Sequence, residues 1–123
     1  MRKLLIFSLL IFAVGCGKQS TDSLVARLSD SDASVRWQAA RALGERRSEA
    51  GVIVPVLGEA LKDKNAYVRR DAAAALGKIG PEAKSAVPAL QVALRDRERS
   101  VRRAAAEALK KIEPEAATLA GTR

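Results

Sequence analysis

The chain has 123 residues, of which 48% are hydrophobic and only 3% aromatic, so one modest domain must build its core from aliphatic side chains. It contains no histidine and a single cysteine, Cys16, which excludes an internal disulfide, most metal sites and any nucleophile-histidine pair. The formal net charge is +8, and a chain rich in Ala, Leu and charged residues favours helices over strands.

Residues 1–15 have the features of a secretory signal peptide. Arg2 and Lys3 precede an apolar run over residues 4–14 that ends in small residues. This run is shorter than the roughly 20 residues that a membrane-spanning helix requires. We therefore predict export rather than a transmembrane segment.

The end of this leader, Ala13-Val14-Gly15-Cys16, resembles the lipobox of bacterial lipoproteins, in which the cysteine becomes the lipidated first residue of the mature chain. Ala13 stands where that box usually has Leu. The resemblance implies lipidation at Cys16, with residues 16–22 as a polar lipidated tether. The alternative is an ordinary secretory leader followed by an incidental cysteine.

The predicted localisation follows from this leader. The protein is expected to be exported and anchored by lipid to the bacterial membrane. If two membranes are present, the outer membrane or the periplasmic face is favoured, because Gly17 rather than Asp follows the cysteine.

The rest of the chain repeats itself at an interval of 33 residues. Such self-similarity is typical of stacked-repeat folds, and it predicts repeats at 23–50, 51–83 and 84–116, with a frayed tail at 117–123. The residues in register are Leu28, Leu61 and Leu94; Asp30, Asp63 and Asp96; Val35-Arg36, Val68-Arg69 and Val101-Arg102; Ala39-Ala40, Ala72-Ala73 and Ala105-Ala106; and Ala42-Leu43, Ala75-Leu76 and Ala108-Leu109.

Each repeat is predicted to form two helices. Pro88 and Pro55 suit the first turn of the first helix in their repeats, where a missing N–H is no loss. A longer second helix carries an apolar stripe over residues 101–112 in the third repeat. Gly80-Pro81 is expected to end the corresponding helix of the second repeat.

The succession of Asp, Val-Arg, Ala-Ala and Ala-Leu-Gly resembles HEAT repeats, particularly the short kind found in phycobilisome-lyase-like proteins. The ankyrin signature and the tetratricopeptide aromatic pattern are both missing. The resemblance implies an all-α fold, a short right-handed α-solenoid of three HEAT-like helical hairpins of the armadillo and HEAT type. The third repeat departs by carrying Lys110 where the others have Gly44 and Gly77, which leaves its exit turn open.

The same resemblance assigns the recurring Asp and Arg residues to a structural ladder, in which an arginine of one repeat bonds to an aspartate of a neighbour. The planar guanidinium suits this role better than a lysine would. The ladder residues are Asp30, Arg36, Asp63, Arg69, Asp96 and Arg102.

Second helices line the concave face of a solenoid, and the positions that do not pack there can contact a partner. Trp37 and Arg41 have the i, i+4 spacing of a pair of the kind that dominates interfaces. The alternative is that Trp37 covers the open edge of the first repeat while the arginines are only solvated. The partner-binding candidates are Trp37, Arg41, Tyr67, Arg70 and Arg103.

The function favoured by these features is a membrane-anchored adaptor or scaffold that binds another envelope protein through its second helices. One alternative is binding of an anionic polymer or lipid headgroup by Arg95, Arg97, Arg99 and Arg103. Another is self-association as one component of a larger solenoid. Export argues against a nucleic-acid partner.

We expect no enzyme activity from this chain. The sequence contains no nucleophile-base pair, no glycine loop that would hold a phosphate, and no cluster of metal ligands. No catalytic, metal-binding or cofactor-binding residue is therefore predicted.

Overall fold

The computed structural model describes residues 19–114. The predicted signal peptide, Cys16 and the predicted tail at 117–123 lie outside the described residues. No strand occurs within residues 19–114, and the predicted all-α fold is confirmed. The helices are α2 (Thr21–Arg27), α3 (Ala33–Leu43), α4 (Ala50–Ala60), α5 (Ala66–Ile79), α6 (Val87–Ala93) and α7 (Arg99–Ile112), with short 3-10 helices η1 (Arg47–Glu49) and η2 (Gly80–Ala86) before α4 and α6.

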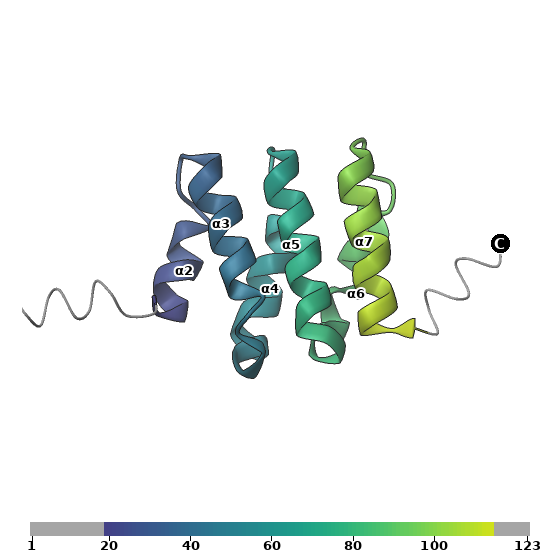
Figure 1. The fold of residues 1–123 in the computed structure, drawn as a ribbon, viewed down its shortest axis with the longest axis horizontal. Helices are drawn as coiled ribbons and strands as arrows, with labels where there is room; N and C mark the ends of the chain where they lie inside the picture. Colours follow the sequence, from purple (N-terminus) through teal and green to yellow (C-terminus); the bar gives the residue numbers. More distant parts are fainter. Residues whose placement is uncertain (1–18, 115–123) are drawn as a thin grey trace, which may run out of the picture.

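The helices form three successive hairpins, α2–α3, α4–α5 and α6–α7. The second helices α3, α5 and α7 lie side by side, each packed against the next, and α4 and α6 lie behind them (Figure 1). Aliphatic side chains from both layers form one continuous core, since isolated hairpins of this size cannot bury their apolar faces alone. Its fully buried members include Leu43, Ile53, Leu57, Leu76 and Leu90.

Two boundaries differ from those predicted. α2 begins at Thr21, inside the range predicted for the tether, because the hydroxyl of Ser20 accepts a hydrogen bond from the backbone N–H of Ser23. Pro55 lies inside α4 rather than in its first turn, because η1 leads directly into a helix that already starts at Ala50. Pro88 does lie in the first turn of α6.

Short polar side chains begin two of the second helices. A side-chain oxygen of Asp32 accepts a hydrogen bond from the N–H of Ser34, and one of Asn65 accepts from the N–H of Tyr67, each at 2.8 Å. These bonds satisfy donors that the first turn of a helix leaves free. At the other end of α5, Gly80 adopts a φ of 81°, a conformation that glycine reaches without steric cost.

The second helices approach one another closely at two glycines. A Cβ atom added at Gly44 would lie 2.9 Å from both Cα and Cβ of Ala75, and one added at Gly77 would lie 3.0 Å from Cα of Ala108. Both distances are well inside ordinary carbon-carbon contact. The pattern Ala-Leu-Gly therefore marks the point where one second helix rests on the next.

Lys110 occupies the corresponding position of the third hairpin. Its side chain is 64% exposed, and its ammonium lies 3.6 Å from the carboxylate of Glu107. A further hairpin stacked on α7 in the same register would have to displace this side chain. The lysine thus opposes continuation of the stack at α7.

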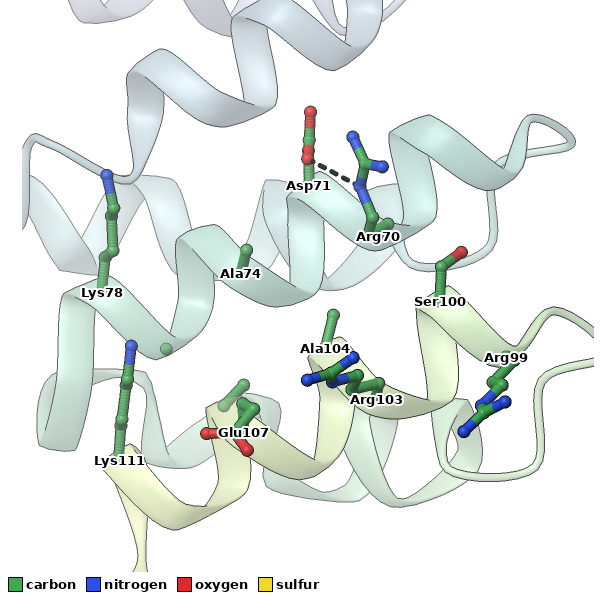
Figure 2. Close-up of a pocket in the computed structure, with 12 residues that line it drawn as sticks. Arg70, Asp71, Ala74, Lys78, Arg99, Ser100, Arg103, Ala104, Glu107 and Lys111 are labelled. Carbon is green, nitrogen blue, oxygen red and sulfur yellow. Dashed lines mark hydrogen bonds and ion pairs between the residues drawn. The ribbon is translucent and has the colours of Figure 1, made fainter.

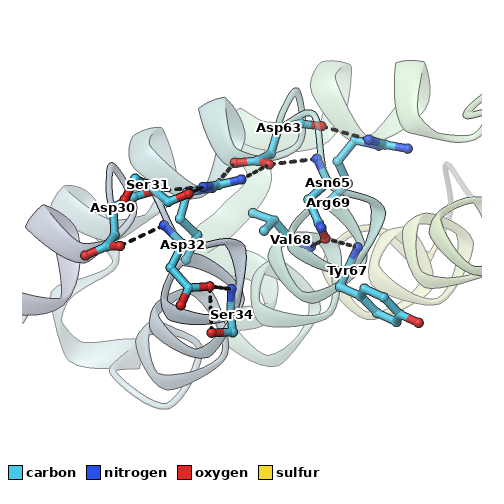
Figure 3. Close-up of polar contacts among 10 residues, drawn as sticks. Asp30, Ser31, Asp32, Ser34, Asp63, Asn65, Tyr67, Val68 and Arg69 are labelled. Carbon is cyan, nitrogen blue, oxygen red and sulfur yellow. Dashed lines mark hydrogen bonds and ion pairs between the residues drawn. The ribbon is translucent and has the colours of Figure 1, made fainter.

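A ladder of ion pairs joins the first part of one second helix to the loop before the next, and Figure 3 shows the contacts around Asp63. Arg36 donates through Nε and Nη2 to the two carboxylate oxygens of Asp63, at 2.9 and 3.2 Å. Arg69 binds Asp96 in the same way, at 2.8 and 3.1 Å. Both arginine side chains are only 7% exposed, so these pairs are bidentate and largely shielded from water.

Each ladder aspartate also shapes its own loop. Oδ1 of Asp63 accepts a hydrogen bond from the backbone N–H of Asn65 at 2.8 Å, and Asp30 and Asp96 make the same bond two residues ahead. Arg102 donates to the carbonyl oxygen of Asp96. Within residues 19–114 it has no acidic partner in a following repeat, and Asp30 receives no arginine from a preceding one.

The ladder changes the acidity of its carboxylates. Burial raises the pKa of Asp63, but hydrogen bonds from Arg36 and from the N–H of Asn65 lower it by more, so the net pKa lies below its ordinary value. Burial, Arg69 and the N–H of Glu98 produce the same net lowering of the pKa of Asp96. Such carboxylates stabilise the fold above their unfolded pKa, and that stabilisation is lost as pH falls through the folded pKa.

We therefore expect the free energy of unfolding to decrease as pH falls below about 4, the ordinary aspartate value. The double variant Asp63→Asn with Asp96→Asn should show a weaker acid dependence and lose about 3 kcal/mol or more at neutral pH, because two buried guanidinium groups lose their charge partners. Urea titrations at a series of pH values measure both effects. Asp30→Asn is the matched control, since Asp30 makes the loop bond without the ion pair; an unchanged acid dependence in the double variant would contradict the account.

Candidate functional site

A groove of about 740 Å³ lies between α5 and α7 (Figure 2). We call it the α5–α7 groove. Five cationic and two acidic side chains line it, so its charge is predominantly positive. The lining residues are Arg70, Asp71, Ala74, Gly77, Lys78, Arg99, Ser100, Arg103, Ala104, Glu107, Ala108 and Lys111.

The repeat places cations of the two helices beside one another. Arg70 and Arg103 occupy equivalent positions and lie toward one end of the groove, whereas Lys78 and Lys111 are also equivalent and lie at the other end (Figure 2). Eight residues separate the two positions along each helix, which corresponds to about 12 Å. Ala74, which is exposed, lies on α5 between them. The groove therefore carries two pairs of cations with a small residue between.

Asp71 is a buried acid in this cationic surface, with only 8% of the residue exposed. Its Oδ1 lies 3.2 Å from Nε of Arg70. Its Oδ2 is buried and has no hydrogen-bond partner within the part of the chain that the structure describes. Leaving a buried acceptor unpaired costs about 1–3 kcal/mol, and more for a charged group. Because this oxygen has almost no exposed surface, a donor from outside the chain cannot reach it in this conformation.

Asp71 also lines a second, smaller hollow of about 270 Å³ between α3 and α5. In Figure 2 its side chain extends from α5 on the side away from α7. Arg70, Asp71, Ala74 and Lys78 line both hollows, and Arg41 contributes from α3. The two hollows therefore adjoin along α5, and together they form one binding face across the second helices.

The structure brings together some of the predicted partner-binding residues but not all. Arg70 and Arg103 line the α5–α7 groove, and Arg41 lines the neighbouring hollow with Arg70. Tyr67 is 60% exposed, and its ring centroid lies 5.1 Å from the guanidinium carbon of Arg70, a cation–π distance. Trp37 is partly buried and lines neither hollow.

The arginines considered for polyanion binding do not form one surface. Arg99 and Arg103 line the α5–α7 groove. Arg95 lines a different hollow, of about 560 Å³, formed mainly by α6 and the end of α4. Arg97 is exposed in the loop before α7. Proximity in sequence is misleading here because this loop connects the two helical layers.

Sequence reasoning missed Asp71, Lys78 and Lys111. A usable signal for Asp71 was present, since Gln38 and Ala104 occupy the equivalent positions and only the middle repeat carries an acid there. Lys78 and Lys111 recur at the repeat interval as well. They share a groove only because α5 packs against α7, and the residue pattern of a single helix does not show this packing.

Residues 19–114 contain no group of three or more His, Cys, Asp or Glu side chains placed to hold a metal ion. None of their helices has the length and hydropathy needed to cross a bilayer.

The chain matches the profile described as HEAT repeats over residues 54–120, and that of the PBS lyase HEAT-like repeat over residues 35–63. It therefore belongs to the HEAT-repeat family, as predicted. No curated protein gives a significant match. The predicted signal peptide and lipid anchor stay predictions.

Solved structures show the same architecture. One similar chain is in the complex of CpcE and CpcF of phycocyanin lyase from Nostoc sp. PCC7120, with 34% identity and a TM-score of 0.75 over 85% of this chain and 41% of that chain. An engineered protein has 27% identity and a TM-score of 0.66 over 77% of this chain and 46% of that chain. The present chain thus spans less than half the length of either one.

Proposed function

We propose that this protein is a HEAT-repeat scaffold that binds another protein through α3, α5 and α7, while lipid on Cys16 holds it at a bacterial membrane. The observation that carries the binding role is the α5–α7 groove, a hollow of about 740 Å³ that five cationic and two acidic side chains line. The similar lyase chain, solved as a complex of two proteins, also supports a protein partner.

A polyanion is the second candidate, and the groove supports it less well. Two of its seven charged lining residues, Asp71 and Glu107, are acids, and these would repel phosphate groups. The arginines of the last loop are also divided between two layers. A protein surface can supply anions and donors together, which matches this mixture better.

Self-association and catalysis are also disfavoured. A further hairpin stacked on α7 would meet the side chain of Lys110. This residue occupies the position at which Gly44 and Gly77 allow the second helices to approach closely. The groove contains no cysteine and the chain no histidine, so we propose binding without catalysis. The similar chain comes from a phycocyanin lyase complex, but the match covers only 41% of that chain. The lyase activity of that complex is therefore not part of the proposal.

Site-specific crosslinking in intact cells tests the binding role. A photoreactive residue at Ala74, in the binding face, should form a discrete adduct with one protein, whereas the same residue at Val92, which is 74% exposed on α6, should not. Replacing Arg70 and Arg103 by Ala should reduce the adduct at position 74 about tenfold or more, since a few central residues dominate most interfaces. Equal labelling from both positions, or none at Ala74, would contradict the proposal.

Membrane fractionation tests the anchor. Cys16→Ser should move the protein from the membrane to the soluble fraction, because each buried methylene of an acyl chain contributes about 0.8 kcal/mol and several chains are lost together. Lys18→Ser is the control, since it changes the neighbouring tether but keeps the cysteine. Retention of the Cys16→Ser protein in membranes would exclude lipid anchoring at this residue.

A further inference from the structure

We infer that Arg70 is the specificity-determining residue of the binding face. Its two Nη groups together bind a carboxylate of a protein partner, while Tyr67 and Asp71 hold the guanidinium in position. The inference rests on the proposed function and names the partner group that the binding face recognises. It depends on contacts that, within residues 19–114, only the middle repeat makes.

The guanidinium of Arg70 is held on two sides. Its carbon lies 5.1 Å from the ring centroid of Tyr67, which precedes it by about one turn of α5. Its Nε donates to Oδ1 of Asp71 at 3.2 Å (Figure 2). The side chain of Asp71 is only 11% exposed, so packing fixes this acceptor. An arginine that is ordered before the partner arrives loses less conformational entropy on binding.

The end of the same guanidinium stays available to a partner. Neither Nη group of Arg70 has a hydrogen-bond partner within residues 19–114. The side chain is 39% exposed, and it lines both hollows of the binding face. The ladder residue Arg36, in contrast, binds Asp63 through Nε and Nη2. Because Asp71 occupies Nε of Arg70, the parallel N–H bonds that remain come from Nη1 and Nη2, and they match the two oxygens of a carboxylate.

A protein carboxylate suits this position better than a polyanion does. Phosphate groups can also accept two parallel N–H bonds, but the carboxylate of Asp71 lies against the same guanidinium. A phosphate polymer or an anionic bilayer brings several further negative charges close to this acid, and each of them is repelled. A protein can place one aspartate or glutamate side chain there and surround it with neutral groups.

Arg103 provides a comparison within the chain. It occupies the equivalent position of α7, but a serine and an alanine, Ser100 and Ala104, stand where α5 has the tyrosine and the acid. Within the part of the chain that the structure describes, no hydrogen bond or ion pair holds its guanidinium. Arg103 thus contributes charge without a fixed direction, so we expect a lysine to replace it but not to replace Arg70.

Substitutions that preserve charge test the role of Arg70 in intact cells. With a photoreactive residue at Ala74, Arg70→Lys should reduce the partner adduct about tenfold, the effect of one lost hydrogen bond to a charged group, because lysine cannot supply two parallel N–H bonds. Arg103→Lys is the matched control and should reduce it less than about threefold, since the field of the groove is unchanged. Circular dichroism and the thermal midpoint verify that both variants fold.

A defined ligand tests the chemistry of the partner group. Fluorescein-labelled hexaglutamate should bind the full chain, and fluorescence anisotropy should show about tenfold weaker binding to Arg70→Lys. Tyr67→Leu should weaken binding about two- to fivefold through loss of the cation–π contact, whereas Ser100→Ala, at the equivalent position, should not. Inorganic polyphosphate, which responds to charge alone, should bind the unmodified chain and Arg70→Lys equally.

The NMR signal of the Nε–H proton of Arg70 tests the positioning role of Asp71. In the unmodified chain this proton should exchange with water more slowly than that of Arg103, because it is hydrogen-bonded. Asp71→Ala should raise its exchange rate to that of Arg103, and Ala104 shows that the repeat accommodates alanine at this position. Gln38→Ala, the exposed equivalent position in α3, should leave the exchange rate unchanged.

The outcomes separate the inference from the function on which it rests. An adduct from Ala74 that Arg70→Lys and Arg103→Lys reduce equally, or not at all, would overturn the inference alone. Tighter binding of polyphosphate or phosphatidylglycerol vesicles than of hexaglutamate would overturn the choice of a carboxylate. Equal exchange at the two arginines would overturn the positioning role. Absence of any adduct at Ala74 would overturn the proposed function as well.

Discussion

The structure depends on the close approach of its second helices. Gly44 rests on Ala75 and Gly77 on Ala108, at distances that leave no room for a side chain. At the same interval, a bidentate pair links an arginine in the first part of one second helix to an aspartate in the loop before the next. Because both contacts recur with the repeat, α3, α5 and α7 are held in one register and form a continuous layer (Figure 1).

This register also creates the binding face. Equivalent residues of successive hairpins become neighbours, so Arg70 and Arg103 share the end of the groove opposite Lys78 and Lys111. The architecture thus converts a periodic sequence into paired cations without any special loop. Asp71 interrupts the period, and its buried Oδ2 has no hydrogen-bond partner within residues 19–114.

Periodicity predicted the features that recur, including the fold, the hairpins and the family, because each repeat makes the same contacts. It failed where a contact occurs once. The start of α4 depends on η1, so Pro55 was misplaced. The burial of Asp71 requires α3 and α5 to be packed together, and the exclusion of Trp37 from the two hollows likewise depends on packing between helices. Neither can be inferred from residue spacing within one helix.

The most direct measurement of this account compares two glycine substitutions by urea denaturation. Gly58 lies in α4 with nothing within 4 Å of an added Cβ, so Gly58→Ala should raise the free energy of unfolding by about 0.5–1 kcal/mol through helix propensity alone. Gly44→Ala should lower it by about 1–3 kcal/mol, because the new methyl group overlaps Ala75. An increase of similar size in both variants would show that the second helices do not pack as closely as described.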